Sequence, residues 1–391
     1  MINIPESGAQ IDADWLSEAV GARVSTFEME FLEGGVLSDA FRLHDIRYAS
    51  DPSTGPISVI VKIASRYERR REMAIENNAY LKELNFFRDL ASDVSLRTPA
   101  IYHANSDGSE GAERFVLVME DLRVHSRVFD QVDDNPDEPF MRKIAVEIAA
   151  MHAKYWESPE IRLPWLSPGS HRYVFTFDAA CRQSPDRLLE FIGLWRKMYG
   201  RELFEEGGAR ESEAITRLLC GPESEIILDR ISDRLSQRPH TLLHGDLRAD
   251  NIFRSDPSLG LGVDDSALTY IDWQLLGVGP PGIDFAQAWI HSLPTAVRRK
   301  DTDVLRLYHE RLVSLNPTAN AYSLDVLIED YVLGLCLWWP ALVTIGANTL
   351  PSFDDSESER MKRLWEVAIP RGLIALADHN SLSIIEAIAA G

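Results

Sequence analysis

The sequence contains few cysteines and has an excess of acidic over basic residues. Its 391 residues include only 3 cysteines, which lie far apart, so we expect neither a disulfide framework nor a cysteine-based metal site. The thiols are expected to be reduced, as in a cytoplasmic protein. Lys and Arg number 40 against 61 Asp and Glu, and the resulting net charge of −21 argues against a nucleic-acid partner.

Long hydrophobic runs are also missing. Residues 1–15 contain acidic residues and no apolar core, so we expect neither a secretory signal nor a transit peptide. The longest apolar run, residues 332–347, is interrupted by Pro340 and is shorter than the about 20 residues that a membrane span needs. We therefore expect a buried helix there, and no membrane partner.

Motifs of several other enzyme classes are absent. The sequence has no G-x-x-x-x-G-K-[ST], no H-E-x-x-H, no paired C-x-x-C and no G-x-S-x-G, so P-loop, zinc and serine-hydrolase sites lack support. Residues 277–282 satisfy G-x-G-x-x-G, but two of them are prolines, which lack the N–H donors that a pyrophosphate cradle needs. We interpret this segment as a rigid turn.

The most informative segment present is His244-Gly245-Asp246-Leu247-Arg248-Ala249-Asp250-Asn251. Asn251 follows Asp246 by five residues, the same step as in the protein-kinase catalytic loop H-R-D-x-x-x-x-N. Phosphoryl transfer from a nucleotide needs an aspartate that orients the attacking hydroxyl and further oxygen ligands that hold Mg²⁺. We predict that Asp246 is the catalytic base and Asn251 a metal ligand. The alternative is an ordinary Asp- and Asn-rich turn before a helix.

A second aspartate completes the predicted magnesium site. Asp272 follows the apolar run 268–271, as the metal-binding aspartate of D-F-G follows a strand in protein kinases. This run and residues 251–254 are expected to form a β-hairpin. We predict that His244 braces the catalytic loop. Asp284 is expected either to accept hydrogen bonds from the loop backbone or to cap the next helix.

The first part of the chain has the pattern of a small antiparallel sheet with one helical segment. Strand-like runs occur at residues 27–32, 40–43, 57–62 and 115–119, and helical spacing at residues 68–90. Lys62 ends the third run, like the lysine of V-A-I-K, whose ammonium pairs with nucleotide phosphates. The alternative is a solvated lysine at a strand end.

An ammonium group in this position needs a carboxylate partner. We prefer Glu76, because residues 76–80 lead into an apolar helix face. Glu72 and Glu83 on neighbouring turns remain open, and an ordinary solvated glutamate is the alternative for Glu76.

Two further segments are predicted to contact the nucleotide. Gly34, Gly35 and Ser38 lie between two strands, where backbone N–H groups and a hydroxyl can cover phosphates, although a plain hairpin turn has the same composition. Glu120 and Leu122 follow a strand, and their backbone can bond the adenine edge, unless the segment is a simple connection.

The remainder of the chain is mainly helical. Ile144, Ile148 and Met151 recur at helical spacing, and the loosely patterned residues 157–239 separate this helix from the catalytic loop. We expect residues 157–239 to be an inserted helical subdomain. The predicted domains are a nucleotide-binding N-lobe, residues 1–121, and a catalytic and acceptor-binding C-lobe, residues 122–391.

These motifs resemble those of the aminoglycoside phosphotransferase family and its choline-kinase-like and ecdysteroid-kinase-like relatives. The resemblance spans roughly residues 27 to 340 and depends mainly on residues 244–251 and on Ile271-Asp272-Trp273. It implies an α+β, two-lobed protein-kinase-like fold, with a small antiparallel-sheet N-lobe and a larger, mainly helical C-lobe that carries a helical insertion. It also implies an enzyme that uses ATP and Mg²⁺ to phosphorylate a hydroxyl group of a small molecule.

The sequence departs from the family pattern at two places. Trp273-Gln274 replaces Phe-Gly, and Arg248 stands where many aminoglycoside kinases carry histidine, so the acceptor stays open among aminoglycoside-, choline- and sterol-like molecules. A non-catalytic pseudokinase would lack Asp246 or a metal ligand, and none is missing. A protein kinase would need an activation segment with A-P-E after Asp272, which the sequence does not contain.

Overall fold

The computed structural model describes residues 2–32, 37–49, 55–109, 112–166, 188–190, 192–193, 209–259, 268–349 and 356–390. It contains two compact units. The sheet unit comprises Met1–Val128 and Ile252–Leu275, and the helical unit comprises Phe129–Asn251 and Leu276–Gly391. The predicted division of the chain after residue 121 stays a prediction.

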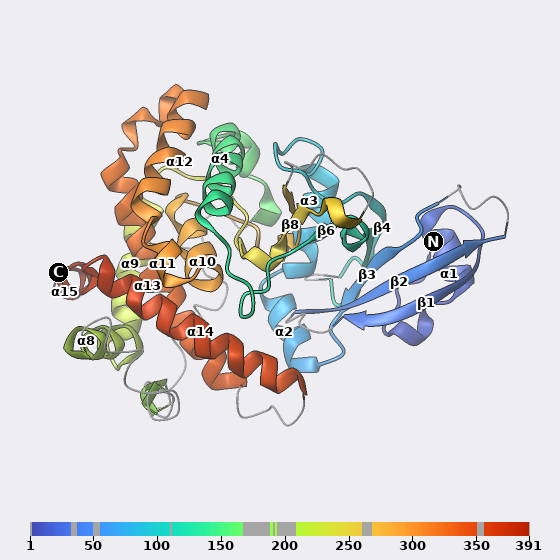
Figure 1. The fold of residues 1–391 in the computed structure, drawn as a ribbon, viewed down its shortest axis with the longest axis horizontal. Coiled ribbons are helices and arrows are strands. Elements are labelled where there is room, and N and C mark those ends of the chain that lie inside the picture. Colours follow the sequence, from blue (N-terminus) through green and yellow to red (C-terminus); the bar gives the residue numbers. More distant parts are fainter. Residues whose placement is uncertain are drawn as a thin grey trace. The chain divides into compact units, whose positions relative to one another are not determined.

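An antiparallel five-stranded sheet with the order β1-β2-β3-β5-β4 is the framework of the sheet unit (Figure 1). Its strands are β1 (Val24–Leu32), β2 (Ser38–Tyr48), β3 (Val59–Ala64), β4 (Ile101–Ser106) and β5 (Phe115–Glu120). The apolar sequence of β5, Phe-Val-Leu-Val-Met-Glu, suits a strand that is buried on both faces. The predicted small antiparallel sheet is confirmed, and β4 is an additional strand.

Helices accompany this sheet at two places. Asp12 caps α1 (Ala13–Val20) by accepting a hydrogen bond of 2.8 Å from the backbone N–H of Trp15, and α1 shares a hydrophobic core with the sheet. The predicted helix at residues 68–90 is in fact two helices, α2 (Glu68–Glu76) and α3 (Ala79–Asp89). They are separated because Asn78 adopts a left-handed conformation, with φ of 52°.

A second, three-stranded sheet of the order β6-β8-β9 completes the sheet unit. Its strands are β6 (Ser126–Arg127), β8 (Ile252–Ser255) and β9 (Leu268–Tyr270), and β8 pairs with β9 in antiparallel register. The hairpin predicted around residues 251–254 and 268–271 is therefore confirmed. Because of this hairpin, the residues at the end of β9 belong to the same unit as β3.

The helical unit contains most of the helices that the structure describes. They are α4 (Glu138–Tyr155), α8 (Ala209–Cys220), α9 (Ser224–Ser236), α10 (Gly282–Ser292), α11 (Thr295–Arg298), α12 (Asp301–Leu315), α13 (Leu324–Thr349), α14 (Ser356–Asp378) and α15 (Ser381–Ala390), with the paired strands β7 (Thr241–Leu243) and β10 (Gly277–Gly279). α8 and α9 fall in the range predicted as an insertion, of which residues 167–187, 191 and 194–208 lie outside the described residues. The predicted fold class, with an antiparallel sheet first and a mainly helical remainder, is confirmed.

Helix α13 is the core helix of this unit. The segment Leu324–Thr344 is long and apolar enough to cross a membrane, but 83% of its most apolar window is buried, as predicted for the run 332–347. α10 approaches it closely at Gly282, where a Cβ atom would lie 2.5 Å from the backbone nitrogen of Tyr331. Only glycine permits this contact without a shift of backbone.

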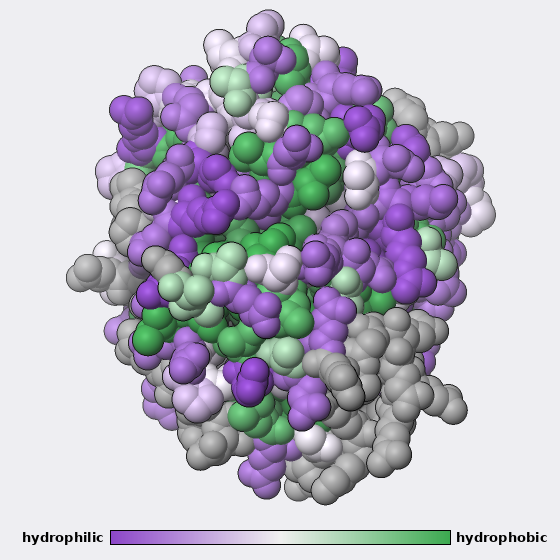
Figure 2. All heavy atoms as spheres, turned by 90° about the vertical axis from the view of Figure 1, so that its left-hand side faces the viewer, coloured by the Kyte–Doolittle hydropathy of each residue, from purple (hydrophilic) through white to green (hydrophobic). Residues whose placement is uncertain are grey.

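Figure 2 shows one face of the molecule, on which hydrophobic side chains gather along the middle and hydrophilic ones interrupt them. In the described part of the helical unit, only Ile226 and Leu315 are exposed large hydrophobic residues. Isolated residues of this kind are common on soluble proteins.

Candidate active site

Lys62 lies in a buried cluster of charges in the sheet unit. It belongs to β3, is 8% exposed, and its Nζ lies 2.8 Å from Asp272 Oδ1 and 2.9 Å from Glu83 Oε2. Burial alone would lower the pKa of Lys62, but the carboxylates of Asp272 and Glu83 outweigh this effect and raise it above its ordinary value. The ammonium group therefore stays charged beside a carboxylate that comes from 210 residues later in the chain.

Glu83, and not Glu76, is the partner of Lys62. Glu76 is the exposed last residue of α2, whereas Glu83 lies in α3 and is only 1% exposed. The break at Asn78 gives α3 its own direction, which sequence periodicity through residues 68–90 does not reveal. The preference for Glu76 is therefore wrong, and Glu83, one of the alternatives left open, replaces it. Burial raises the pKa of the Glu83 carboxyl, and Lys62 opposes this shift.

A ring stack holds α3 against the segment that carries Asp272. The rings of Phe86, in α3, and Trp273 are stacked with their centroids 3.9 Å apart. Such a pair contributes about 0.5–1.5 kcal/mol beyond its buried area. Asp272 itself has φ of 64°, a left-handed conformation that is costly for a residue with a Cβ atom. Trp273 thus occupies the position after Asp272 as an anchor, and the strained turn aims the Asp272 carboxylate at Lys62.

The structure describes only some of the other residues predicted to bind the nucleotide. Gly34 and Gly35 lie outside the described residues. Ser38 is buried at the start of β2, and Leu122 starts a single 3₁₀ turn after β5. The backbone N–H of Glu120 donates a hydrogen bond of 2.8 Å to Ala100 O, so this N–H is already used within the protein.

Asp121, between two of these residues, organises the connection after β5 and was not predicted. Its Oδ2 accepts hydrogen bonds from Ser58 Oγ at 2.5 Å and Arg42 Nε at 2.7 Å, and its Oδ1 accepts one from the Arg123 N–H at 3.1 Å. Asp121 is 1% exposed, and a buried carboxylate requires such donors. Its partners are remote in sequence, so no local pattern identifies it.

In the helical unit, Asp284 holds the backbone of the catalytic loop. Its two carboxylate oxygens accept hydrogen bonds from the N–H groups of His244, at 2.8 Å, and Gly245, at 2.9 Å. Gly245 has φ of 79°, which glycine adopts without strain, and the Asp246 N–H donates to His244 Nδ1 at 3.2 Å. His244 therefore braces the loop, as predicted, and of the two roles left open for Asp284 the structure shows the one that accepts hydrogen bonds from the loop backbone.

The Asp246 carboxylate is oriented by three side chains. Asn251 Nδ2 donates to Asp246 Oδ2 at 3.0 Å and to its backbone oxygen at 2.9 Å. Arg248 Nε lies 3.0 Å from Asp246 Oδ1, and Gln287 Nε2 donates to the same oxygen. Because the Asn251 nitrogen faces Asp246, the amide oxygen of Asn251 is left as the group that suits a cation.

Sequence reasoning missed Gln287, although helical geometry offers a signal. Gln287 is in α10, three residues after Asp284, and residues three apart share one face of a helix. The face that braces the loop backbone therefore also presents a side chain to Asp246. Gln287 is 1% exposed, so this contact is shielded from water.

The G-x-G-x-x-G segment forms no phosphate cradle. Residues 277–279 are strand β10, in which Gly277 pairs with Leu243 of β7, and Gly282 starts α10. This arrangement agrees with the prediction that the prolines exclude such a cradle.

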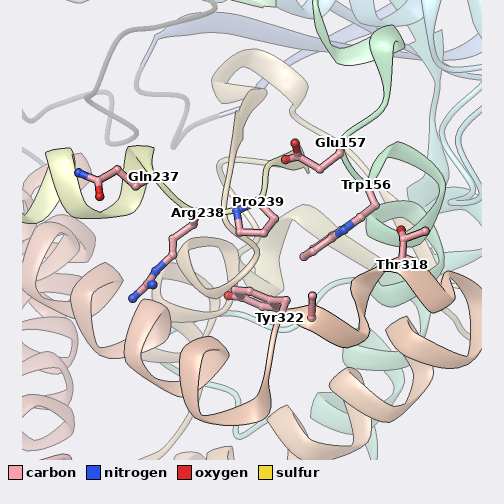
Figure 3. Close-up of a pocket in the computed structure, with 8 residues that line it drawn as sticks. Trp156, Glu157, Gln237, Arg238, Pro239, Thr318 and Tyr322 are labelled. Atoms are coloured by element: carbon pink, nitrogen blue, oxygen red, sulfur yellow. The ribbon is translucent and has the colours of Figure 1, made fainter.

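A cavity of about 440 Å³ lies at the other end of β7 from the catalytic loop (Figure 3). It is lined by Trp156, Glu157, Gln237, Arg238, Pro239, Thr318, Ala321 and Tyr322. The two ends of the predicted insertion meet here, because the Glu157 N–H donates to His240 O at 2.8 Å. The rings of Trp156 and Tyr322 lie 5.3 Å apart in its wall. Pro239 precedes β7 and His244 follows it, so this cavity is distinct from the surroundings of Asp246.

The chain was compared with curated protein sequences and with solved structures. No curated protein sequence matches it. An ethanolamine kinase from Plasmodium vivax is 13% identical with a TM-score of 0.48, over 93% of this chain and 89% of that chain. A choline kinase from Cryptosporidium parvum is 11% identical with a TM-score of 0.48, over 99% of this chain and 94% of that chain.

The family assignment comes from the sequence itself. Residues 28–312 match the model of the phosphotransferase enzyme family, named APH, and this range includes Lys62, Glu83, Asp246, Asn251 and Asp272. Because the match extends over more than half of the chain, the protein belongs to this family of phosphotransferase enzymes.

Proposed function

We propose that this phosphotransferase moves the γ-phosphoryl group of ATP to a hydroxyl group of a small molecule, with Mg²⁺ as the metal. The observation that supports this most directly is the contact of Lys62 with both Asp272 and Glu83 in the sheet unit. It combines an ammonium group for phosphate oxygens with a carboxylate of the type that binds Mg²⁺.

The residues proposed to bind the nucleotide have the charges and oxygen donors that a complex of Mg²⁺ with ATP requires. Lys62 is held charged by Asp272 and Glu83, and we propose that its ammonium binds the α- and β-phosphates. Asp272 and the amide oxygen of Asn251 are the proposed metal ligands, since Mg²⁺ prefers oxygen donors. Bound Mg²⁺ would neutralise part of the charge on the phosphate oxygens.

Asp246 is the proposed catalytic base. Its carboxylate is fixed by Asn251, Arg248 and Gln287, so it can hold an acceptor hydroxyl in one orientation and take up its proton. The braced loop supports this role, because Asp284 prevents the loop backbone from turning away. We also propose that residues 157–239 contact the acceptor, and that the protein works in the cytoplasm.

A screen for transfer tests this function. The purified full chain is mixed with Mg²⁺ and ATP and with aminoglycosides, choline, ethanolamine, sugars and hydroxysterols, and ADP release and the phosphorylated product are measured. We expect a phosphate monoester with one acceptor class in the wild type and none in Asp246→Asn. Binding of Mg²⁺-ATP with no transfer to any acceptor would favour the pseudokinase alternative.

A further inference from the structure

Arg371, in α14, is a partly buried cation for which no described carboxylate provides an ion pair. Its Nη1 donates to two backbone oxygens, those of Gln131 at 3.1 Å and His291 at 3.4 Å. Burial lowers the pKa of Arg371 to about 10, and no acid in the described part of the chain opposes this shift. By contrast, the buried Arg298 has two carboxylate partners, Asp301 and Asp378, and its pKa is raised despite burial.

The guanidinium group of Arg371 retains donors for a further partner. Arginine carries five N–H donors in a planar fork, and both hydrogen bonds of Arg371 to described residues are donated by Nη1. A planar fork of this kind matches the two oxygens of a carboxylate or phosphate. The charge and the donors therefore point to a bound oxyanion.

His291, whose backbone contacts Arg371, has a buried side chain that adds to this site. It is 7% exposed, and neither of its ring nitrogens has a hydrogen-bond partner among the described residues. Burial, together with the positive charges of Arg248 and Arg371, lowers its pKa to about 3. The ring is therefore neutral at physiological pH and offers one N–H donor without a partner.

Helix α10 carries both His291 and the residue that contacts the carboxylate of Asp246. Gln287 donates to Asp246 Oδ1, and His291 follows Gln287 by one helical turn on the same face, about 6 Å along the axis. Arg248 lies 3.0 Å from Asp246 Oδ1 and 3.7 Å from Asp250 Oδ1, so its own charge is already balanced. Arg371 thus supplies a positive charge at the C-terminal end of the helix whose Gln287 contacts Asp246.

We propose that Arg371 and His291 bind an oxyanion on the acceptor, so that the acceptor of this phosphotransferase is a hydroxylated molecule that carries a carboxylate or phosphate. This inference rests on the proposed function, in which Asp246 orients the acceptor hydroxyl. It favours a hydroxy acid or a sugar acid over a cationic amine.

A purely structural role for Arg371 is the alternative. Because His291 lies in the last turn of α10, Arg371 also caps a carbonyl group at the end of that helix. Such a cap stabilises the fold but gives no dependence on anions. The two roles therefore predict different responses to an added oxyanion.

Sulfate is the probe for binding, independent of turnover. The full chain is titrated with sodium sulfate at constant ionic strength, with Mg²⁺-ADP present to occupy the nucleotide-binding residues, and the Tm is recorded. We expect a larger increase in Tm for the wild type and for Arg363→Met than for Arg371→Met. Arg363 is the matched control, because it is an exposed arginine on the same helix. Equal increases in all three proteins would overturn the proposal, since sulfate also stabilises proteins non-specifically.

Matched acceptors then test the charge preference. Glucosamine, glucose, glucuronate and glucose 6-phosphate present a positive, a neutral and two anionic forms of one scaffold. We expect the anionic forms to be turned over best, and Arg371→Met to raise their KM by roughly 10- to 100-fold while KM for ATP stays unchanged. Preference of the wild type for glucosamine would refute the inference and leave the proposed function intact. If none of the four acceptors is phosphorylated, this panel gives no support to the proposed function. The sulfate titration alone then decides whether Arg371 and His291 bind an oxyanion.

Discussion

Asp284 Oδ2 accepts a hydrogen bond of 2.8 Å from the backbone N–H of His244, which lies 40 residues earlier in the chain. The same carboxylate receives the N–H of Gly245, and Gln287 on the same helix reaches the side chain of Asp246. One face of α10 therefore fixes both the backbone of the catalytic loop and the direction of its carboxylate. A mobile aspartate would lose the preorganisation that phosphoryl transfer requires.

Asp284→Ala should loosen the loop and lower stability together. The substitution leaves the buried N–H of His244 and the partly buried N–H of Gly245 without an acceptor, and a buried unpaired N–H group costs about 1–3 kcal/mol. We expect the free energy of unfolding to fall by about 2–5 kcal/mol and transfer to be lost, as measured by urea denaturation and ADP release. Glu310→Ala removes an exposed carboxylate from α12 and serves as the control. Similar losses in both variants would contradict the role of Asp284.

The catalytic loop could be predicted from the sequence because its information is local. The step from Asp246 to Asn251 and the strand before Asp272 are short-range patterns, whereas the contacts of Asn251 with Asp246 and of Asp272 with Lys62 are seen only in the structure. Glu83 was not preferred because a left-handed Asn78 divides a helix that appears continuous in its periodicity. A change in helix direction of this kind depends on a single backbone angle.

Residues whose partners are distant could not be predicted in this way. Asp121 and Arg371 have ordinary sequence neighbours, and only the fold brings Ser58 to the former and α10 to the latter. Strand β4 was likewise missed, because its burial alternates weakly and its stability depends on pairing with β5. Tertiary pairing, and not local pattern, determines these features.

Glu83→Gln and Glu76→Gln form a matched pair that tests the support of Lys62. Glu83 contacts the Lys62 ammonium at 2.9 Å, whereas Glu76 is exposed at the end of α2. We expect Glu83→Gln to weaken binding of Mg²⁺-ATP by about 10-fold or more, the effect of losing a charged hydrogen bond, and Glu76→Gln to leave the Kd unchanged. Calorimetric titration of both glutamate variants with ATP measures the two Kd values. Lys62→Ala gives the upper limit of the loss of ATP affinity. An equal change in both glutamate variants would exclude Glu83 as the specific partner.

His291 should make stability depend on pH in the acidic range. Its pKa in the folded protein is lowered to about 3, below the value of about 6.5 for an unfolded chain, so folding favours the neutral ring. Its contribution is complete above about pH 6.5 and is lost as the pH falls toward 3, by up to about 1.4 kcal/mol per pH unit. Urea denaturation between pH 7 and about pH 4 should show a shallower decline for His291→Gln than for the wild type. Parallel curves would mean that His291 does not titrate in this way.

The roles of Asp246 and Asp272 can be separated by their dependence on metal. Asp246 contacts Asn251, Arg248 and Gln287, and its proposed task is to orient the acceptor, so Asp246→Asn should still bind Mg²⁺-ATP. Its kcat should fall by about 10²–10⁴, as expected when a general base is lost.

Asp272→Asn should behave differently, because Asp272 contacts Lys62 and is the proposed charged ligand of Mg²⁺. The substitution removes a charged oxygen and weakens the hold on Lys62, so Mg²⁺ affinity and ATP affinity should decrease together. Both variants are titrated with Mg²⁺ at fixed ATP and with ATP at saturating Mg²⁺, and kcat is measured with the acceptor found by the screen. If Asp246→Asn loses metal affinity as strongly as Asp272→Asn, or transfers phosphate at the wild-type rate, the assignment of Asp246 as the base is wrong.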